Sequence, residues 1–138
     1  MIKISWEEYL ADIDILVEKI KALDKKKILV GVYGIPRGGL IPAIIISHRL
    51  NIPLMSHTGL GILVIDDISD SGKTFFNMAT QNFHSMGLTC SLYVRKTSRF
   101  YPELYVKQID SDDWLVFPYE ETSSDDENKL KEEHKLKH

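Results

Sequence analysis

The chain has a single cysteine, Cys90, among its 138 residues. One cysteine cannot form an intrachain disulfide, and it leaves no basis for a cysteine metal site. The five histidines show neither metal-ligand spacing nor the placement typical of a Ser-His-Asp triad. The longest apolar run, Leu40 to Ser47, is interrupted by Pro42 and falls short of the ~18 residues that a membrane span needs. The first residues show no secretory leader, so we expect a cytoplasmic protein with no membrane partner.

The chain also has no excess of positive charge, since its formal net charge is −3. That charge comes from residues 120–138, which hold seven acids and four lysines and leave 13 residues of each sign in residues 1–119. The zero net charge of residues 1–119 argues against a nucleic-acid partner, because protein surfaces that bind nucleic acids are normally basic. Residues 120–138 contain only two apolar side chains, Leu130 and Leu136, and cannot pack as a core. We predict a single domain over residues 1–119 and a charged, disordered tail over residues 120–138, with an interaction tail as the alternative.

Helix and strand patterns alternate along residues 1–119. Ser5 and Glu8 form a capping-box pattern that predicts a helix to about Leu23. The other expected helices are 39–50 and 74–86, and the expected strands are 28–33, 52–55, 61–65, 89–94, 105–107 and 115–117. This alternation predicts an α/β fold with a mainly parallel sheet flanked by helices. Glycine-rich loops at 34–39 and 69–74 each follow a strand, so they should share one crevice at the carboxyl ends of the strands.

The second of these loops carries the most chemical information. Its sequence Ser71-Gly72-Lys73-Thr74 is like the end of a Walker nucleotide-binding motif, but that motif needs glycine where Asp67 stands. The segment is instead an apolar predicted strand that ends in Asp66 and Asp67 and is followed by a loop of small residues at a helix N-terminus. The backbone N–H groups of residues 71–74 can bind a phosphate there, and adjacent carboxylates suit ribose hydroxyls and Mg²⁺. The alternative is a strand-turn-helix unit with exposed acids.

Residues 62–74, ILVIDDISDSGKT, resemble the phosphoribosyl-pyrophosphate (PRPP) binding motif of type I phosphoribosyltransferases. Residues 34–40, GIPRGGL, are similar to the pyrophosphate loop of the same family. The resemblance implies a Rossmann-like sheet with a reduced hood, and it places Arg37 and Gly38 against the leaving pyrophosphate. A guanidinium suits phosphate oxygens, and glycine lets the backbone approach them. A structural Gly-Pro turn with a solvated arginine is the alternative for this loop.

Two further segments, residues 93–98 and 114–119, resemble the purine pocket of xanthine-guanine phosphoribosyltransferases. The resemblance implies that Arg95 or Lys96 contacts the 6-oxo group of the base, and the sequence does not choose between them. It also implies that Trp114 stacks on the purine and that the backbone from Leu115 reads the 2-position. For Trp114, burial in the core is the alternative.

The reaction implied by the resemblance joins a purine nitrogen to C1 of PRPP and expels pyrophosphate. Asp66 and Asp67 would bind the ribose hydroxyls and Mg²⁺, and Arg37 would stabilise the departing charge. Asp70 is the candidate general base, although a carboxylate favoured by the helix N-terminus is a comparable interpretation. Ser71, Gly72, Lys73 and Thr74 would bind phosphate. Relatives in the family are commonly homodimers or larger, and we expect the same here.

One departure from the family is plain. Active relatives usually carry a long hood loop before the PRPP motif, which closes over the substrates and excludes water. Here only the five residues 56–60 separate Met55 from Gly61. Another segment or a partner subunit would then cover the site, or the enzyme would be slow or wasteful, or the fold would serve binding alone. Two functions follow: a Mg²⁺-dependent 6-oxopurine phosphoribosyltransferase, or a non-catalytic, regulatory PRPP- or nucleotide-binding protein.

Overall fold

The computed structural model describes residues 1–81 and 87–120. The helices and strands follow one another as β1 (Ile2–Lys3), α1 (Trp6–Leu23), β2 (Gly31–Gly34), α2 (Leu40–Leu50), β3 (Ile62–Ser69), α3 (Lys73–Gln81), β4 (Thr89–Arg95), β5 (Lys107–Ile109) and β6 (Leu115–Val116). Except for Glu120, the predicted tail lies outside the described residues, and so do residues 82–86 at the end of the third predicted helix.

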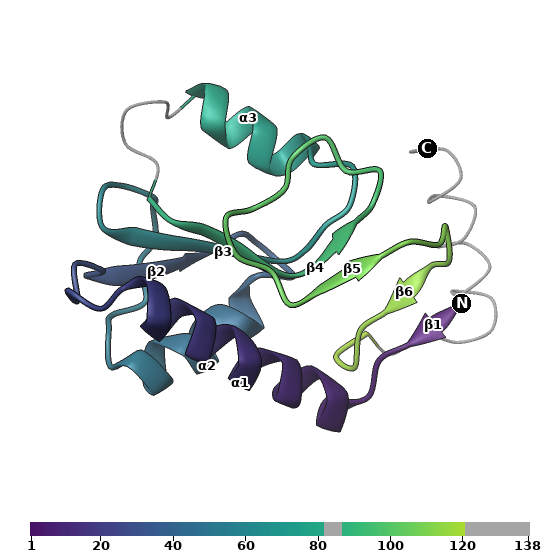
Figure 1. The fold of residues 1–138 in the computed structure, drawn as a ribbon, viewed down its shortest axis with the longest axis horizontal. Coiled ribbons are helices and arrows are strands. Elements are labelled where there is room, and N and C mark those ends of the chain that lie inside the picture. The colour runs from purple at the N-terminus through teal and green to yellow at the C-terminus, as the bar shows by residue number, and fades with distance from the viewer. Residues whose placement is uncertain (82–86, 121–138) are drawn as a thin grey trace.

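The main sheet has the strand order β2-β3-β4-β5, and all its neighbouring strands are parallel. Helices α1 and α2 cover one face of this sheet and α3 covers the other (Figure 1). The predicted α/β fold with a mainly parallel sheet is therefore confirmed. A second sheet pairs β1 with β6, also in parallel. The sequence patterns missed β1, because a strand of two residues is too short to show a period.

Helix α1 forms much of the core. Ser5 caps it as predicted, since its Oγ accepts a hydrogen bond of 3.1 Å from Glu8 N. Its buried face consists of apolar residues at helical spacing, namely Tyr9, Ile13, Leu16, Val17 and Ile20. Leu10, although it lies at helical spacing from Ile13 and Val17, is 40% exposed. The buried face packs with residues of β3 and β4 such as Leu63, Ile65 and Leu92.

Several predicted strand limits are wrong. Strand β2 begins at Gly31, not at Ile28, because Asp24 accepts hydrogen bonds from the backbone N–H groups of Ile28 and Leu29 before the sheet starts. Residues 52–55 contribute only one bridge, Leu54 to Val32. Strand β3 continues to Ser69, so Asp66 and Asp67 lie within the strand. Strand β5 is two residues later than predicted, at Lys107–Ile109.

Among residues 1–81 and 87–120, no helix is both long and apolar enough to cross a membrane.

Candidate functional site

The loop between β3 and α3 has the form expected of a phosphate-binding turn. Gly72 has a φ of +83°, and a Cβ there would lie 2.4 Å from Phe100 N, so this position requires glycine. Arg99 N donates to Ser71 O at 2.9 Å, which holds the turn from the far side. The four predicted phosphate-binding residues, Ser71, Gly72, Lys73 and Thr74, line a cavity of about 90 Å³ together with Asp66 and Asp70. The structure therefore brings this part of the predicted site together.

The two adjacent carboxylates precede this turn. Asp67 is only 9% exposed; its Oδ1 accepts a hydrogen bond from Ile68 N at 2.7 Å, and its Oδ2 accepts one from the hydroxyl of Tyr119. Asp66 Oδ1 accepts from Asp67 N at 2.9 Å. Burial, and next the charge of Asp67, raise the pKa of Asp66 to about 9. Without a ligand, Asp66 therefore keeps its proton at neutral pH.

The first glycine-rich loop lies directly against the carboxylate pair. Ile35 N donates to Ile65 O at 2.9 Å, which ties the start of the loop to β3. A Cβ on Gly38 would lie 2.2 Å from Asp67 Oδ2 and 2.6 Å from its Cγ, so the backbone of the loop touches the carboxylate. The peptide bond between Pro36 and Arg37 is cis. The first loop thus contacts Asp67 of β3, two residues before the second loop begins. That the two loops share one crevice stays a prediction, since the cavities beside them have no lining residue in common.

A second cavity, of about 840 Å³, opens beside this contact. Its lining comprises Arg37, Gly38, Leu40, Ile41, Asp67, Tyr119 and Glu120. Tyr119 stacks on Phe117, with ring centroids 5.7 Å apart, and also contacts Tyr9 edge-on at 5.9 Å. Burial and the charge of Asp67 raise the pKa of Tyr119, so its hydroxyl stays a hydrogen-bond donor. The sequence analysis included Tyr119 only as the last residue of the segment 114–119 and Glu120 as the first residue of the tail. No local pattern points to the contact of Tyr119 with Asp67 across 52 residues.

The predicted base-binding residues lie in and after β4 and at β6. The Arg95 side chain is buried and forms an ion pair with Asp70, from Nε to Oδ1 at 3.1 Å. Lys96 is exposed, and its backbone N donates to Ile109 O at 2.9 Å. Trp114 is half-buried, whereas Leu115 is buried and pairs with Ile2 in the small sheet. That any of these residues contacts a base stays a prediction.

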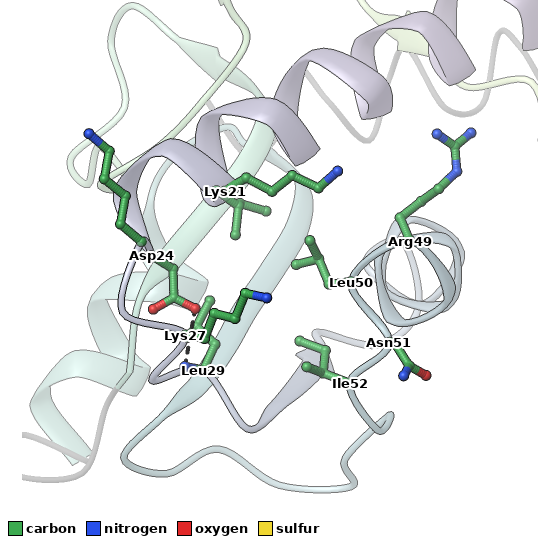
Figure 2. Close-up of a pocket in the computed structure, with 10 residues that line it drawn as sticks. Lys21, Asp24, Lys27, Leu29, Arg49, Leu50, Asn51 and Ile52 are labelled. Carbon is green, nitrogen blue, oxygen red and sulfur yellow. Dashed lines mark hydrogen bonds between the residues drawn. The ribbon is translucent and has the colours of Figure 1, made fainter.

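A third pocket, of about 580 Å³, lies between the C-terminal ends of α1 and α2 (Figure 2). Its lining is partly basic and partly apolar, and comprises Ile20, Lys21, Asp24, Lys25, Lys27, Leu29, Arg49, Leu50, Asn51 and Ile52. Lys21 pairs with Glu18 at 3.5 Å and Arg49 pairs with Asp14 at 2.6 Å. Cations are favoured at helix C-termini, which accounts for these two. None of the predicted site residues lines this pocket.

The short connection between Met55 and Gly61 forms no helix or strand, and Leu60 within it is 75% exposed. It contributes no residue to either cavity at the two loops. Residues 56–60 therefore form no hood over these cavities, and Tyr119 and Glu120 line the cavity beside Asp67 together with Arg37 and Gly38.

No protein-family model matches the chain. Xanthine-guanine phosphoribosyltransferase from Cereibacter sphaeroides is 28% identical over 115 residues, which cover 64% of this chain and 68% of the relative. The enzyme of the same name from Chromohalobacter salexigens is 25% identical, over 85% of this chain and 82% of the relative. Among solved structures, a purine phosphoribosyltransferase from Pyrococcus horikoshii superposes with a TM-score of 0.74 at 26% identity, over 88% of this chain and 95% of that one.

Proposed function

Because the chain is related to the type I phosphoribosyltransferases in both sequence and fold, we propose that it transfers the phosphoribosyl group of PRPP to a 6-oxopurine base and releases pyrophosphate. The names of the relatives support a purine as acceptor, and guanine, xanthine and hypoxanthine are the candidates. The observation that carries the proposal is the contact between Gly38 and Asp67. It sets the arginine-bearing loop against Asp67, which lies within the PRPP-like segment 62–74.

In the proposed reaction, a purine nitrogen attacks C1 of the ribose while the bond from C1 to the pyrophosphate oxygen breaks. The pair of electrons in that bond leaves with the pyrophosphate, where the guanidinium of Arg37 would stabilise the negative charge. Positive charge develops on the ribose ring, beside the carboxylates of Asp66 and Asp67. The proton lost by the purine passes to the carboxylate of Asp70, which acts as the general base.

Phosphate binding in this proposal uses the turn before α3. The backbone N–H groups of residues 71–74 and the Thr74 hydroxyl would bind the 5′-phosphate, with the positive end of the helix dipole behind them. Lys73 adds a positive charge on the phosphate side. The residues of this turn line a cavity of about 90 Å³, where the phosphate would bind.

The carboxylate pair fits Mg²⁺ in chemistry and in number. Carboxylate oxygens are preferred ligands of Mg²⁺, which is commonly held by one or two carboxylates together with substrate phosphates and water. Over residues 1–81 and 87–120, no group of three or more histidine, cysteine or acidic side chains could hold a metal alone. Asp66 and Asp67 would therefore hold the ion only together with PRPP. When bound, it supplies charge stabilisation for the leaving pyrophosphate.

The test is pyrophosphate release from PRPP and Mg²⁺ with guanine, xanthine or hypoxanthine, compared with adenine and with no base. We expect release that depends on a 6-oxopurine and falls by about 100- to 10,000-fold in Asp70→Asn. The control is Asp14→Asn, an exposed acid on α1 that pairs with Arg49. If PRPP binds in calorimetry but no base gives release, the chain is the non-catalytic PRPP-binding protein. The short connection at residues 56–60 favours that alternative, since no hood excludes water.

A further inference from the structure

Arg95 is a charged side chain buried at the end of β4, and it has a specific set of partners. Only 3% of the side chain is exposed, although a guanidinium is costly to bury unless its N–H groups are bonded. Nε donates to Asp70 Oδ1 at 3.1 Å, and Nη1 donates to the carbonyl oxygens of Ser111 at 2.7 Å and Asp113 at 3.0 Å. The burial of the guanidinium and its three hydrogen bonds indicate that its position is fixed by these specific partners.

The partners of Arg95 belong to two different parts of the candidate site. Asp70 opens the turn that leads into α3, beside the phosphate-binding residues. Ser111 and Asp113 belong to the connection between β5 and β6, which runs directly into Trp114. One side chain therefore bonds both the proposed general base and the segment that presents the proposed stacking residue.

We propose that Arg95 is a positioning residue, which fixes Asp70 and the segment 111–114 relative to each other instead of contacting the base. The proposal rests on the function proposed above. The guanidinium suits this role because its N–H groups diverge in a rigid plane, so that separate acceptors can be bonded in fixed directions. A lysine carries a single ammonium on a flexible chain of methylene groups, so it cannot bond these acceptors in the same fixed directions.

This role has a direct consequence for the reaction. Asp70 must lie within hydrogen-bond reach of the purine proton while Trp114 contacts the plane of the same purine. Misplacement by about 1 Å can lower a rate by about 100-fold. Arg95 would thus affect the chemical step and the alignment of the base, and leave the binding of PRPP by the phosphate turn almost unchanged.

The first experiment compares Arg95→Lys, Asp70→Asn and the double variant. We expect Arg95→Lys to lower kcat for guanine by about 10- to 100-fold. Its Kd for PRPP and Mg²⁺, measured by calorimetry without base, should stay within about threefold. Because Arg95 acts through Asp70, adding Arg95→Lys to Asp70→Asn should lower kcat by less than about twofold further. The control is Arg49→Lys, which alters a surface ion pair with Asp14.

A contact between Arg95 and the base predicts a different pattern. Loss of a bond to the 6-oxo group would change the ratio of the inhibition constant of adenine to the KM of hypoxanthine, whereas loss of positioning leaves that ratio unchanged. A change of more than about fivefold in that ratio, or multiplication of the two single effects in the double variant, would overturn the proposal.

A second measurement avoids variants of Arg95, whose buried site makes misfolding a risk. Hydrogen exchange of unliganded Asp70→Asn should be at least fivefold faster than wild type at the amides of Ser111 to Trp114, and unchanged at Lys107 to Ile109. The reason is that Arg95 loses its charged partner and holds the segment less firmly. Unchanged exchange at residues 111–114 would overturn the proposal. The measurement needs no substrate, so its result is separate from failure of the proposed transferase activity, which would show as absent transfer by wild type.

Discussion

Gly38→Ala tests the contact between the first glycine-rich loop and Asp67 with a single methyl group. An added Cβ would lie 2.2 Å from Asp67 Oδ2, more than 1 Å inside the 3.4 Å at which ordinary contact begins. Asp67 cannot easily give way, because both its carboxylate oxygens accept hydrogen bonds, from Ile68 N and from Tyr119. Overpacking of this kind costs about 1–3 kcal/mol, and the loop or the carboxylate must shift by roughly 1 Å.

The shift should be more visible in binding than in folding. Displacement of a ligand-binding group by about 1 Å corresponds to a loss of about 10- to 100-fold. We therefore expect calorimetry to give a Kd for PRPP and Mg²⁺ that is higher by about that factor. Thermal unfolding should still be cooperative, with a free energy of unfolding lower by about 1–3 kcal/mol.

The matched control is Gly59→Ala. A Cβ at Gly59 would lie 3.7 Å from Ile62 Cγ1, which is an ordinary contact. Gly59 belongs to the short connection at residues 56–60, which lines neither cavity of the site. Its affinity for PRPP should match wild type. Equal affinities of Gly38→Ala and Gly59→Ala would refute the inference that the two loops form one binding site.

Asp66→Asn should make the unliganded fold more stable at pH 8, by about 1–3 kcal/mol, and should abolish PRPP binding. The pKa of Asp66 is raised from 3.8 to about 9 in the folded chain, so wild type loses stability as the pH rises between these values, because the unfolded chain releases this proton first. Urea unfolding at pH 5 and pH 8 measures this loss, and equal pH dependence in wild type and variant would contradict it. Tyr119→Phe removes the hydrogen bond to Asp67 and should lower the free energy of unfolding by about 1–2 kcal/mol and PRPP affinity by about fivefold. Tyr105→Phe, on the connection between β4 and β5, is its control, and equal behaviour of the two variants would exclude a role for the Tyr119 hydroxyl.

Features that depend on neighbours in the sequence were predictable. The capping of α1 by Ser5 involves residues three positions apart, and the loop at residues 69–74 follows its strand directly. The fold class followed from the alternation of such local patterns. The parallel pairing of β2 and β3 places the starts of the two glycine-rich loops at the same edge of the sheet.

Contacts between distant segments were not predictable in the same way. Arg95 meets Asp70 across 25 residues and Tyr119 meets Asp67 across 52, and neither spacing repeats in the sequence. Resemblance placed either Arg95 or Lys96 in a base-contacting position, but it could not show that the Arg95 guanidinium is bonded to the carbonyl oxygens of residues 111 and 113. Strand limits were also uncertain, since Asp66 and Asp67 read as the end of a strand and lie within β3.

The most direct test of the proposed site is a crystal structure with Mg²⁺ and the nucleoside monophosphate of guanine. The account predicts the 5′-phosphate on the backbone of residues 71–74, the ribose hydroxyls beside Asp66 and Asp67, and the purine beside Trp114. Binding of the nucleotide elsewhere, for example in the basic pocket between α1 and α2, would contradict it.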